Sequence, residues 1–286
     1  MGLEGKPMLH KMDRFQRCSW KDTFTYLIRV VKAPFSRRRF TVISPPFVKN
    51  CRILDRRDQR IFSLETQSVS DYWTVSQVFF DQDYSIEGIS RYKEIQRIYN
   101  DSLQDSKRSL ILDLGANIGA SARYLSLDWP TVELWCVEPS KRNVELLRRN
   151  VGAATRIFHA AIGGSDGYCI IENPNSQPDG FRICSVVGES SADMVELVSM
   201  QSMMKRILAS GCSPFILKID IEGAESELFQ DAQQWLNDWL VVMIEIHDWM
   251  LPGSASSANV LKAFAEGGRD VIIRGSTLIA IRNGTQ

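Results

Sequence analysis

The strongest constraint on the fold is a regular alternation of short apolar segments with helix-like segments that begins at residue 110. Apolar runs of strand length lie at residues 110–114, 132–137, 156–159, 215–219 and 240–246. Helix-like segments follow the strand-like ones or lie between them, at residues 120–127, 141–150, 201–210, 224–238 and 259–266. This order is typical of a parallel sheet covered by helices.

Other segments predict antiparallel pairing and a helix cap. Ser140 can cap the helix over residues 141–150 with its hydroxyl group. The remaining strand-like segments are residues 168–172, 181–187, 194–199, 271–274 and 277–281. The first two resemble a hairpin, and the last two flank Gly275 and Ser276 and predict a terminal hairpin. An antiparallel hairpin is not the usual ending of a dinucleotide-binding sheet.

The loop after the first strand indicates a ligand site. Asp113 ends the apolar run, Gly115 and Gly119 follow, and a helix-compatible segment comes next. Glycine lets the backbone approach a ligand because it has no Cβ. A dinucleotide fingerprint requires G-x-G-x-x-G after this strand. Here the third glycine is absent and an acid precedes the first, so the loop disfavours NAD.

A second acid identifies the kind of ligand. Glu138 ends the second strand, where a carboxylate is placed to bind ribose hydroxyls. The helix N-terminus near Asp113 would suit an amino acid, with helix amides at its carboxylate and Asp113 near its ammonium. An amino acid joined to a ribose describes S-adenosylmethionine (SAM). Alternatively, Gly115 and Gly119 only form a tight turn, and Asp113 has another partner, because a lone buried carboxylate is costly.

Four elements in chain order resemble the FkbM family of SAM-dependent methyltransferases. They are DLGANIG at Asp113 to Gly119, VEPS ending at Ser140, LKIDIEGAE at residues 217–225, and EIH ending at His247. The first two occur in many class I methyltransferases, whereas the third, paired with the fourth, is close to diagnostic of this family. The resemblance covers residues 107–286, and residues 71–84 more weakly resemble the region before the core in members linked to bacterial glycans.

The resemblance implies a fold and an activity. The implied fold is α/β, a Rossmann-like seven-stranded, mostly parallel sheet with the terminal antiparallel hairpin, preceded here by an α+β extension. The implied activity is O-methylation, often of a sugar or natural-product hydroxyl. We therefore expect SAM as cofactor and a sugar, glycan or glycoconjugate hydroxyl as acceptor, which makes polysaccharide modification the expected role. The alternatives are a small natural product as acceptor, or a degenerate SAM-binding scaffold without catalysis.

The expected catalytic residues follow two strands that are commonly adjacent in such sheets. They are Asp220 and Glu222 at the end of one strand, and Glu245 and His247 at the end of the other. His247 is the first candidate for a general base, because its ordinary pKa lies near neutrality, and Asp220 is the second. A structural histidine bonded to Asp220 or Glu222 is the alternative. The expected cofactor-binding residues are Asp113, Gly115, Ala116, Asn117, Gly119, Glu138, Pro139, Ser140, Ala161 and Asp220.

Two residues of the diagnostic element are expected to be structural, and no metal is assigned. Lys218 lies inside a strand, so its charge must reach a carboxylate or the surface, and Glu225 falls in the first turn of a helix. Three carboxylates with one imidazole could also hold Mg²⁺, Mn²⁺ or Zn²⁺. We keep that arrangement as an alternative to the metal-free reading.

Residues 1–106 form the expected N-terminal extension, and residues 107–286 the methyltransferase domain. Residues 1–60 contain 15 Lys and Arg against 5 Asp and Glu, so the rest of this neutral chain carries a net charge of −10. Aromatic residues interleave with the basic ones, namely Trp20, Phe24, Tyr26, Phe35 and Phe40. The pattern fits peripheral contact with an anionic membrane, but docking of a basic arm onto the acidic domain explains it too and is preferred. Nothing in the sequence indicates nucleic acid or an oligomeric state.

The extension is also expected to contain a hairpin, a helix over residues 90–99 and an aromatic group. The group comprises Tyr72, Trp73, Phe79, Phe80 and Tyr84. It could line a sugar cleft, although packing is the preferred reading. The six cysteines form no CxxC pair, which favours reduced, buried thiols. With no apolar signal segment near Met1, a cytoplasmic location is expected.

Overall fold

The computed structural model describes residues 20–32, 38–46, 48–105, 108–172, 182–187, 194–222, 224–248, 252–253 and 255–284. The chain divides into two compact units, and the boundary lies between Gln82 and Asp83. The start of the methyltransferase domain at residue 107 stays a prediction. No helix among the described residues is long and apolar enough to cross a bilayer.

The first unit combines helices with a small antiparallel sheet. Its elements are α1 (Trp20–Lys32), β1 (Phe40–Val42), β2 (Asn50–Asp55), β3 (Arg60–Glu65), α2 (Val69–Ser76) and the π-helix η2 (Gln77–Asp81). The strands pair in the order β1-β2-β3, which confirms the expected hairpin of β2 and β3. Phe79 is buried against Phe40 and Phe62. Phe79 and the buried Tyr72 are therefore packing residues, as preferred.

The second unit is built on a seven-stranded sheet. Its strands are β4 (Arg108–Leu114), β5 (Glu133–Val137), β6 (Arg156–Phe158), β11 (Cys212–Ile219), β12 (Val241–Glu245), β13 (Asp270–Arg274) and β14 (Thr277–Ile281). Their order is β13-β14-β12-β11-β4-β5-β6. The strands from β6 to β12 are parallel, and β14 runs antiparallel to both of its neighbours. The expected Rossmann-like sheet with a terminal hairpin is confirmed.

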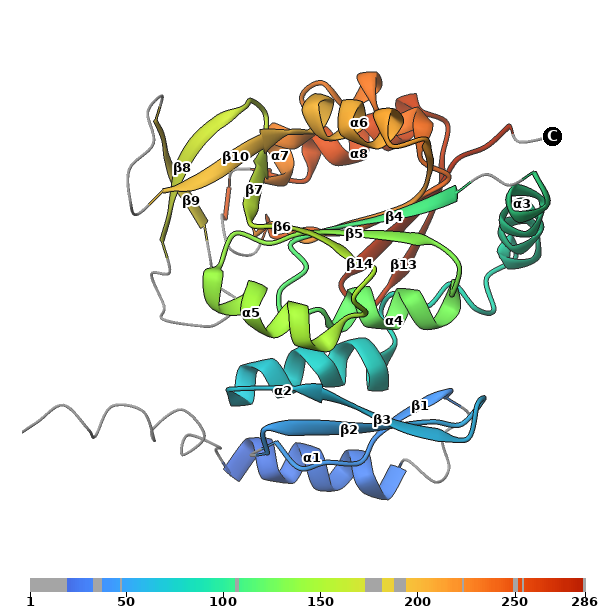
Figure 1. The fold of residues 1–286 in the computed structure, drawn as a ribbon, viewed down its shortest axis with the longest axis vertical. Coiled ribbons are helices and arrows are strands. Elements are labelled where there is room, and N and C mark those ends of the chain that lie inside the picture. The colour runs from blue at the N-terminus through green and yellow to red at the C-terminus, as the bar shows by residue number, and fades with distance from the viewer. Residues whose placement is uncertain are drawn as a thin grey trace, which may run out of the picture. The chain divides into compact units, whose positions relative to one another are not determined.

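Helices cover both faces of this sheet. They are α3 (Tyr92–Gln104), α4 (Ala120–Asp128), α5 (Lys141–Asn150), α6 (Met200–Ala209), α7 (Glu225–Leu228) and α8 (Ala258–Glu266). Figure 1 shows α4 and α5 on one face, with α6 and α8 on the other. The α5 helix has the predicted bounds, and the Ser140 hydroxyl accepts a hydrogen bond from the Asn143 amide. The Ser140 cap is confirmed.

A second sheet was only partly predicted. Its strands are β7 (Ala160–Gly163), β8 (Gly167–Glu172), β9 (Arg182–Val187) and β10 (Val195–Ser199), in the order β7-β10-β8-β9. The hairpin of β8 and β9 is confirmed, and the loop predicted between them lies outside the described residues. The parallel pairing of β10 with β7 was not expected. Residues 160–163 therefore belong to this second sheet, although they directly follow β6 of the main sheet.

The helix predicted over residues 224–238 is wrong. After α7 the chain forms two 3₁₀ helices, η3 (Ala232–Gln234) and η4 (Leu236–Asp238). Arg269 donates hydrogen bonds to the carbonyls of Leu236 and Trp239, and Arg282 donates to that of Asn237. These carbonyls therefore have partners without a continuous helix. Trp235 and Trp239 are fully buried in the core, so tertiary packing overrides the local helical pattern.

Candidate active site

The loop between β4 and α4 lies at the carboxyl edge of the sheet, and its glycines have structural reasons. Gly115 and Gly119 have φ angles of +72° and +88°, which L side chains rarely adopt. A Cβ at Gly115 would lie 1.8 Å from the carbonyl oxygen of Asp220. Asp220 in turn donates its backbone N–H to the carbonyl of Leu114 at 3.0 Å. The first loop is therefore in main-chain contact with the segment that follows β11.

Asp113 and Lys218 form a buried ion pair beneath this loop. Asp113 is 0% exposed, and its Oδ1 lies 3.1 Å from Lys218 Nζ. Its Oδ2 accepts a hydrogen bond from Ser121 at 2.6 Å. Lys218 also donates to the Gly115 carbonyl at 2.8 Å. Burial alone would lower the pKa of Lys218, but the charges of Asp113 and Asp220 outweigh it and raise that pKa.

This pair confirms the carboxylate partner expected for Lys218. It also gives Asp113 the other partner that the sequence left open as an alternative. Asp113 therefore does not need the cofactor ammonium as a partner for its charge. Direct contact between the two stays a prediction.

Glu138 is held at the end of β5 by three donors. Its carboxylate accepts hydrogen bonds from the amides of Asn117 at 2.8 Å and Ser140 at 2.9 Å, and from Asn143 Nδ2 at 3.3 Å. Burial raises the pKa of Glu138 to about 7 despite these bonds. A carboxylate has about four acceptor sites, so one remains for a ribose hydroxyl.

The other predicted cofactor residues surround the same edge. The amides of Gly115 and Ala116 both donate to the Val137 carbonyl, so they hold the loop to β5. His159 is exposed and its Nε2 lies 3.0 Å from the carbonyl of Pro139, the residue that follows Glu138. Ala161 is buried in β7 of the second sheet. The cofactor roles of all these residues stay predictions.

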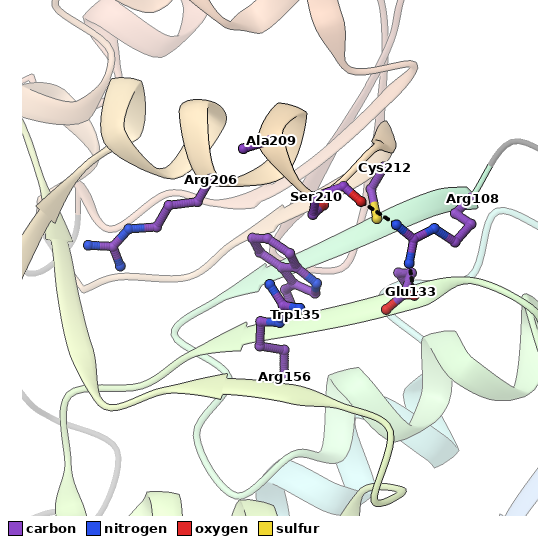
Figure 2. Close-up of a pocket in the computed structure, with 8 residues that line it drawn as sticks. All are labelled: Arg108, Glu133, Trp135, Arg156, Arg206, Ala209, Ser210 and Cys212. Carbon is purple, nitrogen blue, oxygen red and sulfur yellow. Dashed lines mark hydrogen bonds and ion pairs between the residues drawn. The ribbon is translucent and has the colours of Figure 1, made fainter.

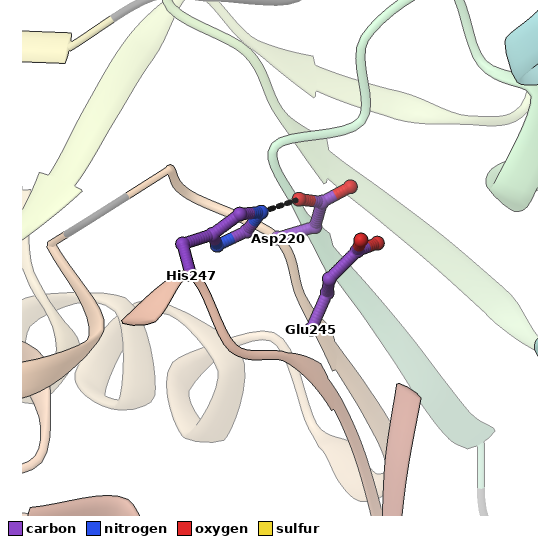
Figure 3. Close-up of side chains that lie close together, drawn as sticks. All are labelled: Asp220, Glu245 and His247. Carbon is purple, nitrogen blue, oxygen red and sulfur yellow. Dashed lines mark ion pairs between the residues drawn. The ribbon is translucent and has the colours of Figure 1, made fainter. Parts of the chain in front are cut away.

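Three of the four predicted catalytic residues converge. One ligand atom from each of Asp220, Glu245 and His247 lies within 4.8 Å of the others. Figure 3 shows the imidazole of His247 pointing toward Asp220, with Glu245 beside them. His247 Nε2 lies 3.6 Å from Asp220 Oδ1. The three groups are close enough to share either a proton or a divalent cation.

Glu222 departs from the predicted arrangement. We expected Asp220 and Glu222 to point the same way because extended strands alternate with period two. This expectation applied only if the extended geometry persisted, and it does not persist, since β11 ends at Ile219 and Glu222 has a φ angle of +47°. Glu222 is not among the three converging residues.

Sequence reasoning missed the partner of His247. Glu225 Oε1 lies 2.7 Å from His247 Nδ1, and both side chains are buried. This contact fixes the ring so that Nε2 faces Asp220. The signal was present, because Glu225 ends the LKIDIEGAE element and His247 ends EIH. Only the structure shows that the two elements meet through this pair.

Tyr84 is a second residue near the candidate site that the sequence analysis placed elsewhere, in the aromatic group of the N-terminal extension. Its ring centroid lies 5.7 Å from Lys218 Nζ, inside the second unit. Burial, opposed by Lys218 and reinforced by Asp220, Glu245 and Asp113, raises the pKa of its hydroxyl well above the usual value. Tyr84 therefore stays a neutral phenol beside these acidic groups.

A separate pocket of about 410 Å³ lies at the opposite edge of the sheet. Figure 2 shows Trp135 among Arg108, Arg156 and Arg206. Arg108, Glu133, Arg156 and Cys212 are the first residues of β4, β5, β6 and β11, so the pocket opens at the amino ends of these strands. Ligands of open α/β sheets bind outside the carboxyl ends. This pocket is therefore distinct from the candidate active site.

The residues at the carboxyl edge fit a SAM molecule. Asn117 Oδ1 is buried without a hydrogen-bond partner among the described residues, and Glu138 keeps an acceptor site. No side chain caps the first turn of α4 in the described structure, so its N–H groups are available to a carboxylate.

The fold and this site define a Rossmann-like methyltransferase. The family profile named Methyltransferase FkbM domain matches residues 113–270. The chain belongs to the FkbM methyltransferase family, as its sequence elements indicated, and its methyl donor is S-adenosylmethionine.

The relatives of this chain are distant. It is 25% identical over 179 residues to the 2-O-methyltransferase NoeI of Sinorhizobium fredii (strain NBRC 101917 / NGR234), covering 57% of this chain and 74% of NoeI. An O-methyltransferase from Bacillus cereus in complex with SAH is 13% identical, with a TM-score of 0.36 over 75% of this chain and 91% of the other. Monomeric WbdD is 13% identical, with a TM-score of 0.37 over 71% and 43%.

Proposed function

We propose that this protein is an O-methyltransferase that acts on a hydroxyl of a sugar, glycan or glycoconjugate. The observation that carries the proposal is the convergence of Asp220, Glu245 and His247 beside the β4–α4 loop. SAM supplies an electrophilic methyl group on a sulfonium when bound. An alcohol acceptor gains from a base that removes its proton as the new bond forms, and this cluster provides candidates for that base.

In this proposal His247 is the base and Glu225 is its positioning residue. The 2.7 Å contact at Nδ1 leaves Nε2 facing Asp220 at the mouth of the site. Asp220 and Glu245 balance the imidazolium that forms after proton transfer. Lys218 and Asp113 hold the ends of β11 and β4 together beneath the loop. In this proposal His247 carries the proton, Glu225 orients its ring, and the other charged groups hold the site in place.

The choice of a sugar hydroxyl rests on weaker support. NoeI is a 2-O-methyltransferase by name and shares 25% identity with this chain. A small natural product remains the alternative acceptor, because the described cluster does not distinguish among hydroxyl groups. A scaffold without catalysis is disfavoured by the intact Asp220, Glu245 and His247. We also propose a cytoplasmic location, because the thiols of Cys51, Cys136 and Cys212 are buried and form no disulfide.

Mass spectrometry of cell-surface glycans tests the acceptor. Cells with and without the protein are compared, and we expect the loss of one methyl group from one glycan when the protein is absent. Calorimetric titration with SAM and with NAD accompanies it. If NAD binds and SAM does not, the O-methyltransferase proposal is withdrawn. If SAM binds and no glycan changes, the sugar is replaced by a small-molecule acceptor.

Removal of divalent ions distinguishes the two readings of the cluster. We expect turnover to be unchanged after exhaustive chelation with EDTA, because the His247 base needs no metal. The measurement is release of S-adenosylhomocysteine before and after chelation. A loss of activity that Mg²⁺ or Mn²⁺ restores would replace the base by a metal site at Asp220, Glu245 and His247.

The pH profile follows from the surroundings of His247. Burial alone would lower the pKa of His247, but the hydrogen bond to Glu225 and the charges of Asp220 and Glu245 outweigh it and raise the pKa to about 9. At pH 7 only about one imidazole in a hundred is then neutral and able to act as base. We expect the turnover rate to rise with pH and to level off above about pH 9. A rate that is flat from pH 6 to 9 contradicts this assignment.

The contribution of His247 to the stability of the fold changes with pH in the direction opposite to the turnover rate. Because its folded pKa is raised above the usual 6.5, the protonated ring stabilises the fold fully below that value. This contribution is lost as the pH rises through about 9. Urea unfolding at several pH values therefore complements the rate profile.

A further inference from the structure

The α1 helix of the first unit turns its apolar face outward. Trp20, Phe24, Leu27, Ile28 and Val31 are all exposed, and Trp20 and Phe24 reach 92% and 66%. Their spacing of 4, 3, 1 and 3 residues places them in one stripe along the helix. A surface helix of a globular protein normally buries such a stripe. Here the described structure leaves it to solvent.

The polar face of α1 makes the contacts within the unit instead. Arg29 lies 2.6 Å from Asp81 Oδ2, and its guanidinium stacks over the ring of Trp73 at 5.2 Å. Asp22 accepts a hydrogen bond from Trp73 Nε1 at 2.9 Å. The helix is thus attached to the unit by charged groups from one side. In ordinary amphipathic packing the apolar face would make these contacts. The apolar stripe of α1 therefore does not serve the core of this unit, and its exposure needs another explanation.

Charge indicates the occupant of the stripe. Residues 1–60 carry 15 basic and 5 acidic residues, and residues 61–82 add only Glu65, Asp71 and Asp81. The first unit therefore has a net charge of 15 − 8 = +7, while the rest of the chain has −7. Lys21 is exposed next to Trp20, where a lysine can extend its ammonium toward headgroups. Exposed Trp, Phe and Leu with basic surroundings are typical of helices that lie in a membrane interface.

We infer that α1 binds the surface of an anionic lipid bilayer, with the five-residue stripe inserted among the acyl chains near the headgroups. The basic first unit attracts the anionic surface, and the stripe holds the helix there. This inference goes beyond the proposed methylation and does not depend on it. It places the enzyme where membrane-linked acceptors are accessible.

Vesicle sedimentation with the full-length chain tests the inference. One set of vesicles holds equal parts of phosphatidylcholine and phosphatidylglycerol, and the other holds phosphatidylcholine alone. We expect binding to the anionic vesicles that falls at high salt. The double variant Phe24→Ser with Leu27→Ser should lose at least about tenfold in vesicle affinity, because two large apolar side chains leave the bilayer.

The matched control is Leu208→Ser, which removes a 61% exposed leucine from α6 of the second unit. We expect wild-type vesicle binding for this variant and unchanged SAM affinity for both variants. The inference is overturned if the double variant binds vesicles as tightly as the wild type, or if Leu208→Ser loses as much vesicle affinity as the double variant. The inference is also overturned if the wild-type chain does not bind vesicles and light scattering shows it to be a dimer, while the double variant is a monomer. The stripe would then be covered by a second copy.

Discussion

Replacing His247 with Ala should lower turnover by roughly 10²- to 10⁴-fold, the usual contribution of a general base. SAM affinity should change little, because no predicted cofactor contact involves the imidazole. The measurement is release of S-adenosylhomocysteine at saturating SAM with an acceptor found by the glycan comparison. Turnover within about twofold of wild type would remove His247 from the mechanism and leave Asp220 as the candidate base.

A companion variant separates base strength from structure. Glu225→Gln can keep the hydrogen bond to Nδ1 but removes the negative charge that helps to raise the pKa of His247. The rising limb of the pH profile should therefore move toward lower pH. Glu227→Gln, an exposed neighbour on the same helix, is the matched control and should leave the profile in place. A purely structural Glu225 would change stability without moving that limb.

The largest effect on stability is expected from Lys218→Met. This change leaves the Asp113 carboxylate fully buried without its cation, and breaking a buried pair in this way costs roughly 3–5 kcal/mol. Urea unfolding followed by circular dichroism gives the free energy of unfolding. Lys262→Met serves as control, because its ammonium is exposed on α8 and lies 3.8 Å from Glu266. An exposed pair of this kind contributes about 0.3–0.5 kcal/mol.

The double variant Asp113→Asn with Lys218→Met decides whether charge is the cause. Removing both charges should recover part of the lost stability, since no uncompensated carboxylate then remains in the core. If Lys218→Met costs less than about 1 kcal/mol, the pair is not the stabilising element described above.

The main sheet could be predicted because its strands carry their own signals. The parallel strands β4, β5, β11 and β12 are mostly apolar and mostly buried, and Gly275 marks the terminal turn. The α5 helix was predicted to the residue because Ser140 caps it and Val144 and Leu147 repeat on one side. The segment after α7 could not be predicted, because Arg269 comes from beyond α8 to satisfy its carbonyls. Long-range partners of this kind leave no local pattern.

The candidate site was predictable as a set of residues and unpredictable as a set of contacts. Asp220, Glu245 and His247 follow neighbouring strands, so topology alone brings them together. The pairing of His247 with Glu225 depends on how α7 starts after the turn at Glu222. Tyr84 enters from a loop that precedes the sheet by more than twenty residues. No periodic pattern links that loop to the site.

The contact between Gly115 and the Asp220 carbonyl has a consequence for acceptor choice. The two loops touch through their main chains, and no space is left for a Cβ at Gly115. A side chain at residue 115 would displace this main-chain contact, whereas substitutions elsewhere in either loop are expected to leave it in place. An enlarged or reduced acceptor is therefore expected to be accommodated by side chains around the cluster, such as the partly exposed Glu222. Acceptor size is then adjusted by side chains, while the main-chain contact between the two loops is kept.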